Sequence, residues 1–220
     1  MPAVTARFPK QHRFSTLVRD VRACTACERM AYAHVLGAAN GRLNARVLVV
    51  AEAVGRRGGA MTGVPLTRDE SGKRFSEFLA FAGIDRGDVF ITNAVLCNPL
   101  DERGRNRTPS AREIARCRPF LARTLDIVDA PIVVALGRVA LEALRAVAPH
   151  EGEMPRDIAR VVPWDGRALI AMYHPSRQST LHRPDALQRD DWRRLGAIIG
   201  RLGAASLRFA PAAAAGYAVP

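Results

Sequence analysis

Lysine is almost absent from this chain: it occurs only at positions 10 and 73, so nearly all of the 33 basic residues are arginines. Acidic residues are also few, 21 in all, which leaves a formal net charge of +12. A surplus of positive charge attracts polyanions, so it favours nucleic acid or an anionic membrane surface as the partner over an acidic protein. A genome rich in arginine codons is the alternative explanation of this composition.

Long hydrophobic runs are also missing. No stretch reaches the ~18 consecutive apolar residues typical of a membrane span, and no charged start leads into an apolar stretch as in a signal peptide. We therefore expect a cytoplasmic protein with no membrane partner. The 220 residues, 48% of them hydrophobic, suffice for one sizeable core, which excludes a mini-protein and favours one α/β domain over two. This domain is expected to span residues 1–203, because residues 204–220 are low in complexity and are typical of a tail.

Strand and helix patterns alternate along the chain. Runs rich in apolar and β-branched residues predict strands at 43–53, 89–95, 131–136 and 169–173. Helical patterns lie between or after them, at 71–82, 110–128, 138–147 and 190–202. Ser110, followed three residues later by Glu113, is typical of a capping box at a helix start. The alternation predicts a three-layer α/β/α sandwich around a central, mostly parallel four-stranded sheet, with functional loops at the carboxyl ends of the strands.

The chain has only four cysteines, unevenly spaced. Cys24 and Cys27 are separated by two residues, Cys97 follows a predicted strand, and Cys117 lies in a predicted helix. A disulfide framework is unusual in a cytosolic protein, so a close pair with two distant partners indicates a site of four thiolates. Such a site binds zinc or an iron–sulfur cluster, and the spacing does not decide between them. Four independent buried thiols are the alternative.

The loop after the first predicted strand is rich in glycine and arginine. Glycines at 55, 58, 59 and 63 let a ligand approach the backbone closely, and Arg56 and Arg57 add positive charge. The loop lacks the Gly-Lys-Ser/Thr ending of a phosphate-binding loop and the glycine spacing of a dinucleotide fingerprint. A nucleotide-binding enzyme therefore stays open as an interpretation, without direct support.

Two other predicted strands end in polar side chains. Asn93 lies near the end of the second strand, where an amide offers the donor and acceptor that reading the edge of a base requires. An asparagine in that place is also common as a turn residue. His174 follows the fourth strand, is fixed by Pro175 and precedes a basic loop. It suits acid or electrophilic chemistry, and equally a structural role in packing.

Together these segments resemble the uracil-DNA glycosylase superfamily, and in particular its iron–sulfur branches, families 4 and 5. The resemblance runs from Cys24 to about Leu181. It is carried by the cysteine quartet and by three motifs, at 92–97, 108–121 and 174–176. The resemblance implies that the metal is a four-iron, four-sulfur (4Fe–4S) cluster rather than zinc.

The first motif departs from the family pattern, which usually has Gly at the position of Ala51 and Pro at that of Val54. Glu52 resembles family 4, whereas residues 62–72 resemble family 5. In family 5 an aromatic residue normally stacks on the base where this chain has Leu66, so stacking is weaker here or comes from Phe75. The basic run ending in His that marks the covalently trapping branch is absent from the first loop.

The resemblance implies a DNA repair enzyme that flips uracil out of single- or double-stranded DNA and hydrolyses its N-glycosidic bond, leaving an abasic site and free uracil. We expect a monomer associated with the nucleoid. His174 would donate to the departing base, and Asp69 would supply negative charge and orient the water, with Glu52 as second choice. Asp69, together with Ser71, would otherwise only cap the next helix.

The predicted base pocket combines side chains and backbone. Asn93 would read the uracil edge, and the backbone at Glu52 and Ala53 would contact a carbonyl oxygen of the base. Leu66 or Phe75 would lie against the ring.

Contacts with DNA are expected from two loops, and these residues are Arg56, Arg57, Ser176, Arg177, Leu181 and His182. Leu181 would fill the gap that the flipped base leaves, braced by Arg177 and His182.

Two other classes of protein stay open at this point. One is a DNA-binding protein that recognises uracil or another lesion without releasing the base, or that traps it covalently. The other is a small-molecule nucleotide enzyme with a structural zinc site. Release of the base tests the first alternative, and the brown colour of an iron–sulfur protein tests the second.

Overall fold

The structure is a computed structural model that describes residues 9–204. Its main sheet has five strands in the order β3-β2-β5-β7-β6. Their bounds are Val47–Ala53 for β2, Val89–Val95 for β3, Ile132–Leu136 for β5, Val161–Trp164 for β6 and Arg167–Met172 for β7. The first four strands in this order run parallel, and β6 pairs antiparallel with β7. A separate two-stranded sheet joins β1 (Met30–Ala31) to β4 (Asn98–Pro99).

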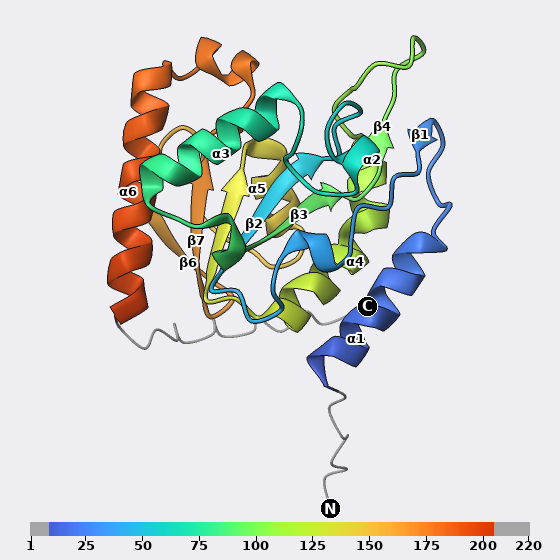
Figure 1. The fold of residues 1–220 in the computed structure, drawn as a ribbon, viewed down its shortest axis with the longest axis horizontal. Helices are drawn as coiled ribbons and strands as arrows, with labels where there is room; N and C mark the ends of the chain where they lie inside the picture. Colours follow the sequence, from blue (N-terminus) through green and yellow to red (C-terminus); the bar gives the residue numbers. More distant parts are fainter. Residues whose placement is uncertain (1–8, 205–220) are drawn as a thin grey trace, which may run out of the picture.

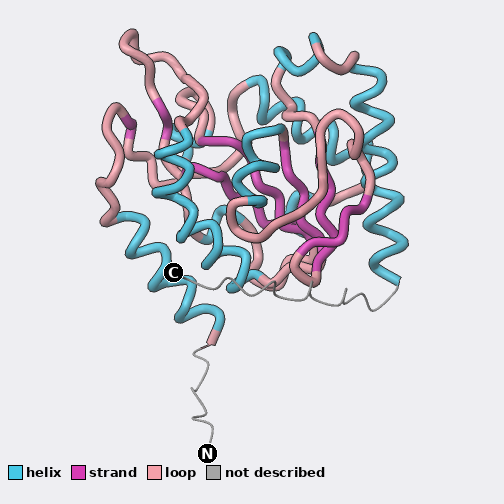
Figure 2. The backbone as a smooth tube through the Cα atoms, turned by 180° about the vertical axis from the view of Figure 1, so that it is seen from behind, coloured by secondary structure: helices cyan, strands magenta, loops and turns pink. Residues whose placement is uncertain are grey.

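Helices cover both faces of the main sheet, which confirms the α/β architecture expected from the sequence (Figure 1). On one side, α3 (Glu70–Ala82) packs against α6 (Asp185–Ala204). On the other side lie α1 (Lys10–Arg22), α4 (Ala111–Val128) and α5 (Arg138–Arg145), as the view from behind shows (Figure 2). The shorter helices are η1 (Ala38–Asn40), α2 (Gly59–Thr62), η2 (Arg86–Asp88) and η3 (Arg177–Leu181).

The strand patterns follow from burial on both faces of the sheet. All seven residues of β3 and all five of β5 are buried, so these strands are continuous apolar runs rather than alternating ones. Thr92 and Asn93 are the polar exceptions in β3. Thr92 Oγ1 and Asn93 Nδ2 have no hydrogen-bond partner within residues 9–204, which costs stability unless a ligand or water satisfies them.

The strand count differs from the expected four. The additional strand, β6, is short, contains Pro163 and is only partly buried, so its apolar pattern is weak. It joins β7 through a turn at Asp165 and Gly166, which both have positive φ. Asp-Gly between apolar residues is a strong hairpin signal and could have revealed this strand.

Other differences concern helices. Helix α1 was not expected, and α6 begins at Asp185 rather than at 190. The capping box at Ser110 and Glu113 is confirmed. From residue 205 onward, the tail expected at 204–220 lies outside the described residues. Within residues 9–204, no helix has the length and apolar character required to span a membrane.

Candidate active site

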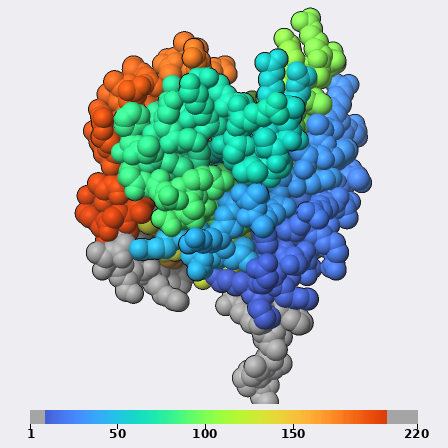
Figure 3. All heavy atoms as spheres, viewed as in Figure 1, coloured from blue at the N-terminus to red at the C-terminus, as the bar shows by residue number. Residues whose placement is uncertain are grey.

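A cavity of about 330 Å³ lies at the carboxyl edge of the parallel strands. Its lining combines residues from the ends of β2 and β3 with the segment after β7, where ligands usually bind in open α/β sheets. Glu52, Asp69, Asn93 and His174 all line this cavity, which we call the base pocket. Four side chains that are far apart in the sequence are thus brought together. In Figure 3 the surface is hollowed at the top of the view, between α3 and the segment after β7 on one side and the 56–62 and 100–107 loops on the other.

Asn93 is the best-defined binding group in the base pocket. It is 3% exposed, it is held in β3 opposite Ala51 of β2, and its Nδ2 has no hydrogen-bond partner within residues 9–204. A buried amide with a free donor is costly unless a ligand or water satisfies it. The base pocket therefore fits a ligand with an acceptor aimed at Asn93.

His174 follows β7 and is half-buried where it lines the base pocket. Desolvation lowers its pKa to about 4, while the nearby Asp69 carboxylate acts in the opposite direction and raises it. The imidazole is therefore neutral at pH 7 and can donate from only one ring nitrogen. A neutral donor suits a group that becomes negatively charged during a reaction, because it needs no proton transfer in advance.

Asp69 both caps α3 and lines the base pocket. One carboxylate oxygen, Oδ1, accepts a hydrogen bond from the backbone N of Gly72 at 2.9 Å, so Asp69 caps α3 as the alternative interpretation held. The other oxygen, Oδ2, lies against the backbone of Gly55 and Gly58, at the base pocket. The cap therefore fixes Asp69 in the pocket, and the two roles are compatible.

Glu52 lies at the end of β2, half-buried in the base pocket. Burial raises the pKa of its carboxyl group, and a hydrogen bond from the Thr108 side chain partly offsets this. Glu52 and Asp69 thus both present a carboxyl group to the base pocket.

Two residues were expected to lie against the base with apolar surface. Of these, only Leu66 lines the base pocket, in a backbone conformation with φ of 51°. The expectation for Phe75 was wrong: it is fully buried and packs edge to face on Trp192, with ring centroids 5.7 Å apart. On α3, Phe75 shares its face with Phe78 and Leu79, the spacing of a core-facing stripe. Ala53 lines the base pocket as expected.

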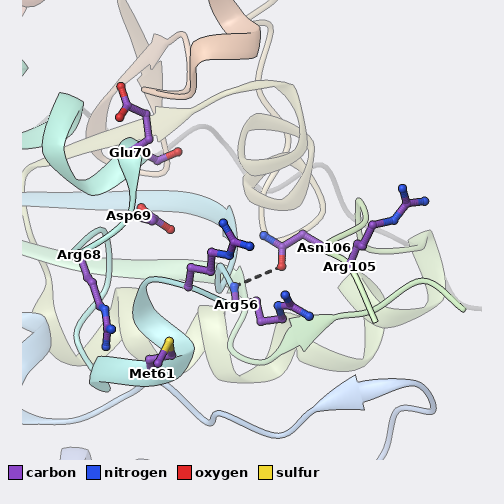
Figure 4. Close-up of a pocket in the computed structure, with 9 residues that line it drawn as sticks. Arg56, Met61, Arg68, Asp69, Glu70, Arg105 and Asn106 are labelled. Carbon is purple, nitrogen blue, oxygen red and sulfur yellow. Dashed lines mark hydrogen bonds between the residues drawn. The ribbon is translucent and has the colours of Figure 1, made fainter. Parts of the chain in front are cut away.

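The residues expected to contact DNA surround the base pocket. Arg56 and Arg57 line a neighbouring pocket, drawn in Figure 4. Ser176 lines the base pocket itself. Together with His182 it also lines a third cavity of about 630 Å³, which shares Glu52, His174, Ser176 and Gln178 with the base pocket.

The loop after His174 also carries two exposed side chains that were expected to contact DNA. Leu181 is 81% exposed at the end of η3. Arg177 is exposed as well, and its Nε donates to Glu70 Oε1 at 3.0 Å. An apolar side chain this exposed is unusual and is available to a partner.

Several residues at the base pocket were missed from the sequence. Asn98 is 1% exposed, and its Nδ2 donates to the Val54 carbonyl at 2.7 Å and to Asn106 Oδ1 at 3.0 Å. Arg107 forms a two-point ion pair with Glu113, at 2.8 and 2.6 Å. These contacts join residues of the loop before α4 to other segments. No local pattern in the sequence predicts them.

The four cysteine thiols lie within electrostatic range of one another. Burial raises the pKa of Cys117 to about 12 and also that of Cys97, and the charges of Cys24 and Cys27 raise both further. The backbone N of Leu96 donates to Cys117 Sγ at 3.5 Å. In the described part of the chain, no three His, Cys, Asp or Glu side chains are grouped closely enough to hold a single metal ion. Four cysteine thiolates are a donor set that both structural zinc sites and iron–sulfur clusters use.

The fold and the base pocket define an α/β protein with a ligand site at the carboxyl edge of a parallel sheet. Residues 38–196 match the family model of the uracil DNA glycosylase superfamily. The match covers most of the chain, and the chain belongs to this superfamily.

Characterised relatives bear names of two types. The type-4 uracil-DNA glycosylase of Archaeoglobus fulgidus is 29% identical over 84% of this chain and 92% of its own length. The type-4 enzyme of Thermotoga maritima is 32% identical over 77% of this chain and 84% of its own length. The type-5 uracil-DNA glycosylase of Pyrobaculum aerophilum is 34% identical over 62% of this chain and 63% of its own length. The resemblance to families 4 and 5 is confirmed.

Proposed function

We propose that this protein is a uracil-DNA glycosylase that releases uracil from DNA and leaves an abasic site. The observation that carries the proposal is the buried Asn93 amide with its free Nδ2, which shares one pocket with His174 and Asp69. Uracil offers a carbonyl acceptor beside an N–H donor, which an asparagine amide pairs in two points. The relatives named as type-4 and type-5 uracil-DNA glycosylases support the same activity.

The reaction breaks the bond between N1 of uracil and C1′ of the sugar. The electron pair leaves with the base, which becomes an anion, and the sugar develops positive charge. Neutral His174 donates a hydrogen bond to a carbonyl oxygen of the departing base and stabilises that negative charge. The Asp69 carboxylate stabilises the positive charge on the sugar, orients a water molecule toward C1′ and accepts its proton. Glu52 is the second candidate for this role.

The base reaches the base pocket only after it leaves the helical stack, which costs a few kcal/mol in duplex DNA. We propose that Leu181 fills the vacated space, and its exposure at the end of η3, in the segment that follows His174, supports this role. Arg177 and His182 flank it on the same loop.

We also propose that Cys24, Cys27, Cys97 and Cys117 hold a 4Fe–4S cluster. The support is the all-cysteine donor set, the mutual electrostatic influence of the thiols and the type-4 and type-5 names of the relatives. When bound, the cluster would supply structural cross-linking rather than chemistry at the base, because none of the four cysteines lines the base pocket.

The test is uracil release from labelled oligonucleotides. Purified protein is incubated with single- and double-stranded DNA that carries one uracil, and half of each sample is heated in alkali before a denaturing gel. The proposal expects scission only after alkali, with no retarded band, and loss of scission in Asn93→Ala and His174→Ala. Absence of scission in the wild-type protein contradicts the proposal, and a retarded band would then indicate covalent trapping.

A further inference from the structure

A second pocket, of about 870 Å³, opens beside the base pocket, and four of its nine lining residues are arginines (Figure 4). We call it the arginine pocket, and its lining residues are Arg56, Arg57, Met61, Arg68, Asp69, Glu70, Ser71, Arg105 and Asn106. It shares Asp69, Ser71 and Asn106 with the base pocket. In the view of Figure 4, Arg56 and Asn106 lie between Arg68 on one side and Arg105 on the other. A strand that delivers a base to the base pocket would therefore pass along the arginine pocket.

The charges in the arginine pocket do not balance. Its two acidic residues are engaged, since Asp69 caps α3 and Glu70 pairs with Arg177. Arg57 and Arg68, by contrast, have no hydrogen bond or ion pair to any side chain or backbone group of residues 9–204. Both side chains are exposed. The pocket thus presents two guanidinium groups without a paired carboxylate, and guanidinium groups bind phosphate well.

The other two arginines are already held in place. Arg56 Nη1 donates to the Gly104 carbonyl at 2.7 Å, and the backbone N of Arg56 donates to Asn106 Oδ1 at 3.1 Å. Arg105 pairs with Asp101 at 2.8 Å. These contacts shape the wall of the pocket, so Arg57 and Arg68 are the groups free to bind an anion.

Met61 indicates which anion is bound. It is 60% exposed at the end of α2, in the same pocket as the arginines. A free phosphate or pyrophosphate gains nothing from a flexible apolar side chain, whereas a nucleotide strand offers sugar and base surface next to each phosphate. The combination fits a polynucleotide better than an inorganic anion.

We propose that the arginine pocket binds the DNA strand adjoining the flipped nucleotide, with Arg57 and Arg68 on backbone phosphates and Met61 against a sugar or base. The proposal rests on the proposed function, because it takes the base pocket as the place where the flipped base is held. It adds Arg68 and Met61 to the DNA-binding surface and gives Arg57 a defined partner.

The test measures binding of an undamaged single-stranded oligonucleotide over a range of salt concentrations. Each phosphate contact on a single strand contributes about 0.7 to the slope of log affinity against log salt. Arg57→Gln and Arg68→Gln should each lower the slope by about 0.7, and the double variant by about 1.4. Arg46→Gln is the matched control, because Arg46 is exposed just before β2, at the opposite edge of the sheet, and loses the same charge. Met61→Gln should weaken binding about fourfold, the worth of roughly one buried CH₂ group, without changing the slope.

Equal slopes in Arg57→Gln, Arg68→Gln and Arg46→Gln would overturn the proposal. Unchanged binding by Met61→Gln would overturn the strand assignment in favour of a site for phosphate alone. Uracil release is measured separately, so the two hypotheses fail in different ways. A protein that shows the expected slopes but releases no uracil contradicts the proposed function and supports the arginine pocket.

Discussion

Asn98 donates a hydrogen bond from its Nδ2 to Oδ1 of Asn106 at 3.0 Å, and the same nitrogen donates to the Val54 carbonyl at 2.7 Å. Asn106 Oδ1 also accepts from the backbone N of Arg56 at 3.1 Å. Two amides thus hold the loop after β2 in place. This loop carries the glycines against which the Asp69 carboxylate lies. Asn98 and Asn106 therefore support the wall of the base pocket.

The pair predicts an asymmetry between two substitutions of the same kind. Asn106→Asp keeps the oxygen that accepts both hydrogen bonds, whereas Asn98→Asp replaces a donor by an oxygen that faces the Val54 carbonyl. Asn98→Asp should lower the free energy of unfolding by about 1–3 kcal/mol and slow uracil release, because it leaves the buried Val54 carbonyl without its donor. Asn106→Asp should change both much less. Urea unfolding and single-turnover release measure the two effects, and equal losses in both variants would contradict this account.

Gly58 tests the placement of Asp69. A Cβ at Gly58 would lie 2.8 Å from Asp69 Cγ and 2.8 Å from the Thr67 carbonyl oxygen, closer than real Cβ atoms come. Gly58→Ala should therefore displace the Asp69 carboxylate and reduce uracil release nearly as much as Asp69→Ala does. Gly37→Ala is the control, since a Cβ there meets nothing within 4 Å. Full activity of Gly58→Ala would show that the position of Asp69 is not important for the reaction.

The pKa of His174 predicts how the protein responds to acid. Because its pKa in the folded protein is about 4, below the usual 6.5, the unfolded chain binds a proton at a higher pH than the folded one. Stability due to neutral His174 is therefore complete above about pH 6.5 and is lost as the pH falls from 6.5 toward 4. Thermal unfolding from pH 7 to pH 4 should show a steeper decline for the wild type than for His174→Gln. The rate of uracil release should show no titration near pH 6.5. A change of rate at that pH would show that His174 titrates normally.

The sequence was sufficient where local pattern and burial agree. The run at 89–95 is apolar throughout because β3 is covered on both faces, and its bounds agree with the prediction. Asn93 was identifiable because a polar residue interrupts that run near its end. The capping box at Ser110 and Glu113 was identifiable because both partners lie within one helical turn.

The sequence was insufficient where contacts join distant segments. The link from Asn98 to Val54 spans 44 residues, so neither local pattern contains it. Phe75 was misassigned because its type suits stacking on a base, although its spacing with Phe78 places it in the core beside Trp192. The aromatic side chain of Phe75 suggested a function in the site. The helical spacing of Phe75 and Phe78 indicates a core position instead.

The ion pair of Arg107 and Glu113 predicts a second dependence on pH. The Arg107 guanidinium, together with hydrogen bonds from Ser110, lowers the pKa of Glu113 from 4.5 to about 2. Stability from this carboxylate is therefore fully present above pH 4.5 and is lost as the pH falls toward 2. Glu113→Gln should lower the free energy of unfolding at pH 7 by about 1.5–3 kcal/mol, the value of hydrogen bonds to a charged group.

The control for Glu113 is Glu77→Gln, at an exposed position of α3. In urea, this variant should have the same free energy of unfolding as the wild type at pH 5 and at pH 3. The difference between Glu113→Gln and the wild type should shrink between pH 5 and pH 3. A difference that stays constant over that range would assign the loss to packing rather than to the charge.

Removal of the proposed cluster should loosen one segment and spare its neighbour. No residue from Arg22 to Met30 is buried, so this stretch, which carries Cys24 and Cys27, has little apolar packing of its own. Helix α1 just before it is anchored independently: Leu17 is fully buried, and Phe14 packs edge to face on Phe90 with ring centroids 5.9 Å apart.

Cys24→Ser should therefore lose iron and brown colour, and the amides of residues 23–31 should exchange hydrogen much faster than in the wild type. The amides of 10–22 should keep most of their protection, because α1 stays packed on α4 and β3. Thr25→Ser, a change of one methyl group in the same exposed stretch, is the control and should keep both iron and protection. Exchange rates that rise equally over 10–31 in Cys24→Ser would show that α1 depends on the cluster, and unchanged rates with full iron content would show that Cys24 is not a ligand.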